Sequence, residues 1–130
     1  MEAAYTKELT EPELAAKIDE LLYDLNLPSH FVGYYYLKSA ILQTVLCKKK
    51  LPDISYGLFA KIAKDFNVDK RHVERAITKA VSYIESLSCR KGITQTILGY
   101  EIRTPNSPIS AKELIALIAD QLRIQYYDYY

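Results

Sequence analysis

The chain is poor in the residues that enzymes and metal sites usually need. Its 130 residues include only two histidines and two cysteines, and no tryptophan. Cys47 and Cys89 have no Cys or His neighbour at metal-ligand spacing, so we expect them to be reduced and packed. With four glycines, the chain has no Gly-rich phosphate loop, and it shows no nucleophile paired with a base. These absences favour a protein that is not an enzyme and that binds neither a metal nor a cofactor.

Long apolar runs are also missing. The apolar stretches end well short of the length needed to span a bilayer, so we expect no transmembrane helix and no membrane contact. The first residues, Met1 to Ala4, carry an acid where a secretory signal would carry a base. A composition that is 49% hydrophobic and 25% charged is typical of a globular protein. We therefore expect a cytoplasmic protein with one domain.

Sustained strand alternation is absent as well, and the strong signals are capped helices. Thr10 and Ser110 each begin a capping box, which predicts helices that start at these two residues. Apolar spacing predicts a long helix from Tyr34 to about Lys48, a pair of helices that starts at Leu58 and whose second helix ends within 86–92, and a short helix over 94–99. The sequence thus predicts an all-α fold. Its expected parts are a flexible N-terminus (1–9), a single all-helical domain (10–125) and a Tyr-rich tail (126–130).

Each long helix has a predicted apolar face. For the helix that starts at Tyr34, this face comprises Tyr35, Leu37, Ala40, Ile41, Thr44 and Val45. For the pair of helices, the faces comprise Leu58, Phe59, Ile62, Ala63 and Phe66, and then Val73, Ala76, Ile77, Ala80, Val81 and Ile84. The run Tyr34–Tyr36 favours packing with hydroxyls at the rim over a base-stacking platform, since stacking platforms are usually sheets. The lone His30 favours a hydrogen-bonded turn residue.

The pair of helices has the pattern of a helix-turn-helix. Asn67 tolerates the left-handed conformation that ends a helix, and Asp69 is suited to cap the next one. The second helix carries a polar face whose side chains can bond to phosphates or base edges. That face comprises Lys70, Arg71, Glu74, Arg75, Thr78 and Lys79. An ordinary helical hairpin with a solvated charged face fits the spacing equally well.

The charge distribution favours the first of these two interpretations. The chain has a net charge of +1, but residues 38–91 hold twelve Lys and Arg against five Asp and Glu, a net charge of +7. Residues 1–37 have a net charge of −5 and residues 92–130 of −1. Basic charge concentrated on one segment suits the neutralisation of phosphates. Lys48–Lys50 fit either a solvated helix end or a phosphate clamp, and Lys49 joins the candidate DNA-binding residues.

Several motifs recur in the order found in one known family. They are Leu27-Pro28, Gly33-Tyr34 with Tyr36-Leu37 and Ala40-Ile41, Ile62-Ala63-Lys64, Val73-Glu74-Arg75-Ala76-Ile77, Leu98-Gly99-Tyr100, Ile115-Ala116, Ile118-Ala119-Asp120 and Leu122-Arg123. Over roughly three quarters of its length, the chain resembles the C-terminal DNA-binding domain of stage-zero sporulation protein A, a sporulation response regulator of Firmicutes.

The resemblance implies a fold of about six helices of the response-regulator effector type, winged-helix-like but without a sheet. It implies a transcription regulator whose recognition helix enters the major groove of a box resembling TGTCGAA. Such domains bind their boxes in tandem and contact the sigma subunit of RNA polymerase. Glu74 and Arg75 match the base-reading pair of the family, with Arg75 on a guanine and Glu74 on a cytosine.

The chain also departs from the family. Thr78-Lys79 stands where the family has Arg-His, and Ala60 replaces a proline of the first motif helix. The loop 88–94 matches the region used near sigma, with different residues. No receiver domain precedes the match, so the chain is either an excised effector domain or a stand-alone relative, and the capped acidic start favours the second. An alternative function is an interaction module that acts on sigma or on a full-length relative without reading DNA. The Tyr-rich tail is either frayed or a self-association patch.

Overall fold

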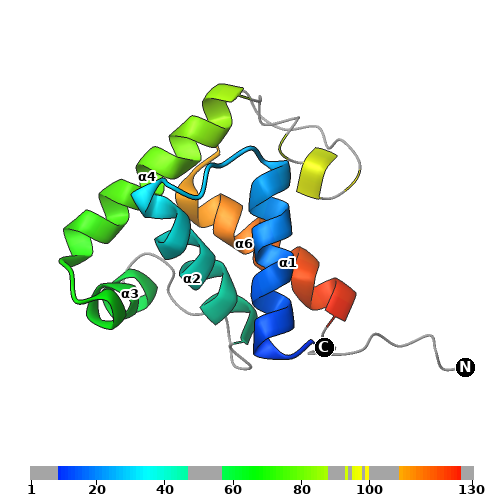
Figure 1. The fold of residues 1–130 in the computed structure, drawn as a ribbon, viewed down its shortest axis with the longest axis horizontal. Helices are drawn as coiled ribbons and strands as arrows, with labels where there is room; N and C mark the ends of the chain where they lie inside the picture. Colours follow the sequence, from blue (N-terminus) through cyan, green and yellow to red (C-terminus); the bar gives the residue numbers. More distant parts are fainter. Residues whose placement is uncertain are drawn as a thin grey trace, which may run out of the picture.

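The structure is a computed structural model that describes residues 9–46, 57–87, 93, 95–97, 99 and 109–126. This part of the chain contains the labelled helices of Figure 1 and no strand. The helices are α1 (Glu11–Asp24), α2 (Val32–Leu46), α3 (Phe59–Phe66), α4 (Lys70–Leu87) and α6 (Ala111–Tyr126). Residues 93 and 95–97 are helical too. The predicted all-α class is confirmed.

Both predicted capping boxes are present. The Thr10 hydroxyl accepts from the Glu13 N–H at 3.3 Å, and the Glu13 carboxylate accepts from the Thr10 N–H at 2.9 Å. Ser110 and Glu113 form the same two bonds before α6, at 3.1 and 2.9 Å. Each box satisfies N–H groups that a helix start would otherwise leave unpaired. Helices α1 and α6 therefore begin where the sequence predicts.

Helix α2 is the centre of the fold, because it contacts α1, α3, α4 and α6 (Figure 1). Its buried residues are Gly33, Tyr34, Tyr36, Leu37, Ala40, Ile41, Thr44 and Val45. The prediction that Tyr35 lies on the buried face is wrong, since its side chain is 52% exposed. A helix surrounded by neighbours has no broad polar face, so apolar spacing alone does not identify the side that meets solvent.

Tyr34 and Tyr36 are buried, as the packing interpretation of the Tyr34–Tyr36 run predicts. The buried Tyr34 donates its hydroxyl proton to the Asp19 carboxylate of α1 at 2.6 Å. The ammonium group of Lys38 bonds to the other oxygen of Asp19 at 3.0 Å. Burial, and then the bond to Asp19, raise the pKa of Tyr34 well above its usual value. Asp19 thus joins α1 to α2 through two polar contacts.

Gly33 allows α2 to approach α4 closely. A Cβ atom at this position would lie 2.1 Å from the backbone oxygen of Ala76 in α4. No side chain fits that space, so only glycine permits the observed contact between the first turn of α2 and the middle of α4. This contact fixes how α4, the second helix of the predicted helix-turn-helix, sits on the core.

Arg123 is a buried charge that joins α6 to the end of α2. Its side chain is only 6% exposed. The guanidinium donates to the Thr44 oxygen at 2.8 Å and to the Val45 oxygen at 3.4 Å. These carbonyls belong to the last turn of α2, where helix carbonyls lack partners and where a positive charge is favoured. The buried arginine therefore serves as a C-terminal cap for the central helix.

Candidate nucleic-acid interface

A short turn joins α3 to α4. Asn67 has φ 56° and ψ 49°, the left-handed conformation predicted for it. The Val68 N–H donates to the Ala63 oxygen at 2.9 Å, which closes the end of α3. The Asp69 carbonyl accepts the first bond of α4, from the Val73 N–H at 3.2 Å. The left-handed end of α3 at Asn67 and the start of α4 directly after Asp69 are confirmed, and the two helices are joined as in a helix-turn-helix. Capping of α4 by the Asp69 carboxylate stays a prediction.

Helix α3 buries less than the sequence predicts. Phe59, Ile62 and Ala63 are buried, and so is Leu58 just before the helix. Phe66 was predicted to be buried with them, but it is 42% exposed. The helix has only eight residues, and its last turn reaches the edge of the core. There, the Phe66 ring packs edge-on against the Tyr36 ring, with centroids 5.0 Å apart.

Helix α4 has one buried and one exposed face. Val73, Ile77, Ala80, Val81 and Ile84 are buried as predicted, and Ala76 is half-buried. On the opposite face, the exposed residues include Arg71, Arg75, Thr78 and Lys79. These four side chains form no hydrogen bond or ion pair with any other residue in the described part of the chain. The three cations among them are therefore available to an anionic partner.

Two further candidates lie along one edge of this face. The Lys70 ammonium and the Glu74 carboxylate form an ion pair at 3.2 Å, and both side chains are part-exposed. Spacing of i and i+4 on a helix permits this contact. Glu74, expected to bind a cytosine, is thus paired within its own helix in the free protein.

His72 is a candidate that the sequence interpretation missed. It lies on α4 between the Tyr36 ring, 5.5 Å away between centroids, and a surface hollow that it lines with Arg75 and Lys79. The sequence pattern indicates this position, since residues 72, 75 and 79 have the i, i+3, i+7 spacing of one helical strip.

Lys49, with Lys48 and Lys50, lies outside the described residues, as do Cys47, Cys89 and all of the loop 88–94 except Ile93.

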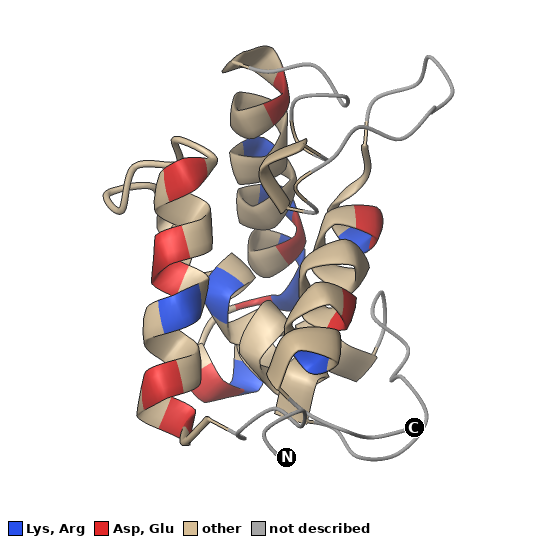
Figure 2. Cartoon of the chain, turned by 90° about the vertical axis from the view of Figure 1, so that its right-hand side faces the viewer, with Lys and Arg blue, Asp and Glu red and all other residues tan. Residues whose placement is uncertain are grey.

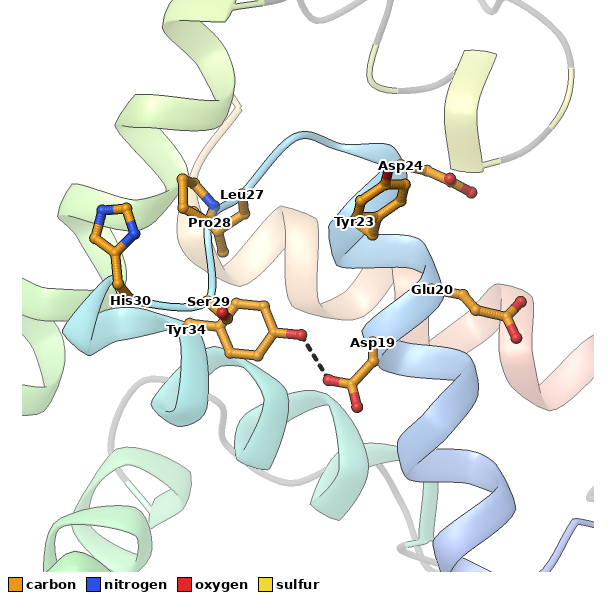
Figure 3. Close-up of a pocket in the computed structure, with 9 residues that line it drawn as sticks. All are labelled: Asp19, Glu20, Tyr23, Asp24, Leu27, Pro28, Ser29, His30 and Tyr34. Atoms are coloured by element: carbon orange, nitrogen blue, oxygen red, sulfur yellow. Dashed lines mark hydrogen bonds between the residues drawn. The ribbon is translucent and has the colours of Figure 1, made fainter.

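Helix α1 carries acidic side chains, in contrast to the basic exposed face of α4. Acidic residues follow this helix along its length (the helix at the left of Figure 2). A hollow of about 730 Å³ lies between α1 and the start of α2, with Asp19, Glu20 and Asp24 in its lining. In Figure 3 the Tyr34 ring, which also lines this hollow, points from α2 toward Asp19 on α1. His30 lines the same hollow and packs against Phe31, with ring centroids 5.5 Å apart. The acidic side chains that line the hollow between α1 and α2 repel phosphates, so this hollow does not suit DNA.

Two features of metal-binding and membrane proteins are absent from the described ranges. No group of three or more His, Cys, Asp and Glu side chains there is arranged to hold a metal ion. No helix in the same part of the structure is long and apolar enough to cross a membrane.

A comparison with protein families gives the domain to which the helix pair belongs. The family model described as sporulation initiation factor Spo0A C terminal matches residues 18–122. The chain belongs to this family. The match runs from the middle of α1 into α6 and includes the whole helix-turn-helix. The Spo0A C-terminal family is one of DNA-binding regulatory domains of sporulation and is not an enzyme family. The helix pair is thus part of a DNA-binding domain that regulates transcription.

Proposed function

We propose that this Spo0A C-terminal domain binds double-stranded DNA sequence-specifically by placing α4 in the major groove of a box resembling TGTCGAA. The observation that carries the proposal is the exposed face of α4, where Arg71, Arg75 and Lys79 have no partner among the described residues. An α-helix fits the major groove, and unpaired cations on it meet the phosphates and the guanine edges. Its place of action is then the cytoplasm, with its DNA.

Arg75 and Glu74 are proposed to read bases. A bidentate contact from Arg75 to a guanine contributes about 1–3 kcal/mol of discrimination. To accept a hydrogen bond from a cytosine amino group, the Glu74 carboxylate must break its ion pair with Lys70 or bind both groups at once. A part-exposed pair at this spacing is worth only about 0.3–0.5 kcal/mol, so a base contact outweighs it. Lys70, at the same edge of α4, is proposed to contact a phosphate.

Three further parts of the proposal follow the family resemblance. Two domains bind neighbouring boxes in tandem, and the domain contacts the sigma subunit of RNA polymerase through the loop 88–94. Lys49 adds a phosphate contact beside the motif. We expect Lys49→Ala to weaken binding to any duplex alike and to lower its salt dependence, because a phosphate contact carries no sequence information.

The test is a titration of the protein with a TGTCGAA-type duplex and with a scrambled duplex at two salt concentrations. We expect a clear preference for the box, and we expect Arg75→Ala to reduce that preference by about 5- to 150-fold. Lys17→Ala is the matched control, since it removes one positive charge from α1, where Lys17 pairs with Glu20 at 3.7 Å. Equal affinity of the wild-type protein for both duplexes would refute sequence-specific reading.

The alternative is an interaction module that keeps this fold, does not read DNA, and acts on sigma or on a full-length relative. Thr78 and Lys79 motivate it because they differ from the family pattern, and the acidic hollow of Figure 3 offers a surface for a basic partner. Co-purification with a sigma factor or a relative, together with no DNA retention at low salt, would favour this alternative.

A further inference from the structure

A second hollow lies between the start of α2 and the exposed face of α4. Its volume is about 390 Å³, and its walls are residues 31–33 on one side and His72, Arg75 and Lys79 on the other. Gly33 and Ala76, where α2 is in direct contact with the backbone of α4, both line this hollow. Among the residues that line it, Val32 is apolar and 58% exposed.

The geometry of α4 assigns different directions to its polar residues. Successive residues are rotated by about 100° around a helix axis. Relative to Arg75, Lys79 is then rotated by about 40° toward the α2 side, where Ala76 meets Gly33, and Thr78 by about 60° away from it. With Arg75 and Glu74 both directed at base edges, the base-facing side of α4 is centred between them, near Thr78. Lys79 and His72 then face one flank of the groove. A helix with its side chains is about as wide as the major groove, so residues on its flanks meet the sugar-phosphate backbone.

We propose that this hollow is a binding site for one backbone phosphate, held by Lys79 with His72 beside it. This inference rests on the proposed entry of α4 into the major groove. Lys79 is then a positioning residue that sets the placement of α4, and Thr78 is the residue of the Thr78-Lys79 pair that affects base preference. A lysine ammonium is a compact charge with three donors, which suits a phosphate. The sugar-phosphate chain also covers Val32 and so keeps salt ions away from the Lys79 ammonium and the phosphate. Their attraction is then screened less.

The first test measures affinity for the box duplex and the scrambled duplex over a range of salt concentrations. Each phosphate contact contributes about 0.9 to the slope of log affinity against log salt concentration. We expect Lys79→Ala to reduce the slope by about 0.9 and to weaken both duplexes by the same factor, about eightfold at 0.1 M salt. Thr78→Ala is the matched variant, and it should change the ratio of the two affinities and leave the slope unchanged. Circular dichroism and melting curves check that both variants are folded.

The second test uses box duplexes that each carry one uncharged methylphosphonate in place of a phosphate. We expect one linkage at which this change weakens binding of the wild-type protein but has no further effect on Lys79→Ala. Lys79→Arg should restore the sensitivity at that linkage, because it restores the charge.

The outcomes separate this inference from the proposed function. If Lys79→Ala changes the ratio of affinities at an unchanged slope, or if no linkage shows the coupling, Lys79 does not hold a phosphate in this hollow. The reading of the box by Arg75 would stand in either case. If the wild-type protein binds neither duplex at low salt, or binds both with equal affinity, the proposed function and this inference fail together.

Discussion

Replacing Gly33 by alanine tests the close contact between α2 and α4. The added Cβ would lie 2.1 Å from the Ala76 oxygen, whereas ordinary van der Waals contact begins at about 3.4 Å. That oxygen belongs to a helix backbone and cannot rotate away, so the two helices must separate by about 1.3 Å. Overpacking of this kind costs about 1–3 kcal/mol or more, and the higher helix propensity of alanine returns at most about 1 kcal/mol. We expect the free energy of unfolding to fall by about 2 kcal/mol.

The assay is urea unfolding followed by far-ultraviolet circular dichroism, with a thermal melt in parallel. A loss of this size in a domain of this length lowers the melting temperature by roughly 6–10 °C. Gly57→Ala is the control, because a Cβ there meets no atom within 4 Å, and we expect it to leave stability unchanged or to raise it by up to about 1 kcal/mol. Equal stability of Gly33→Ala and the wild-type protein would show that the helices have room to spare, and the reasoning about this contact would be wrong.

Four other substitutions have defined expectations. Arg123→Met leaves the carbonyls at the end of α2 without their buried donor, so urea unfolding should show a loss of about 2 kcal/mol; an unchanged midpoint would exclude the capping role. Tyr34 has a folded-state pKa above the unfolded value of 10.0. Its stabilisation is therefore complete below about pH 10 and is lost as the pH rises beyond it. Tyr34→Phe should unfold more easily at pH 7 by about 1 kcal/mol, and its stability should then fall less steeply than that of the wild-type protein above pH 10. A parallel decline in both proteins would contradict this assignment. Thr10→Ala should cost about 1 kcal/mol through loss of the α1 cap, and a second cap variant, Ser110→Ala, should cost a similar amount.

The features that the sequence predicts correctly are local. A capping box depends on two side chains three residues apart, so Thr10 and Ser110 identify their helix starts without knowledge of the rest of the chain. The turn at Asn67 and the buried stripe of α4 are equally local, because one depends on a single backbone conformation and the other on spacing within one helix.

The features that the sequence does not predict depend on distant partners. Spacing placed Tyr35 in the core because it could not show that α2 is surrounded by four helices. Neither the contact of Gly33 with α4 nor the bonds from Arg123 to α2 have a signal within their own segments. At the candidate site, the spacing within α4 predicts its exposed face. The hollow beside His72 has no such signal, because it forms only where α2 packs against α4.

The most direct test of major-groove reading by α4 replaces each guanine of the box in turn by 7-deazaguanine, which lacks the N7 acceptor of the major groove. A bidentate arginine contact needs that acceptor. We predict one guanine at which the replacement weakens wild-type binding by about fivefold or more, while Arg75→Ala binds the normal and the modified duplex equally well. Equal losses in the wild-type protein and in Arg75→Ala at every guanine would show that Arg75 reads no guanine, and would contradict the central claim.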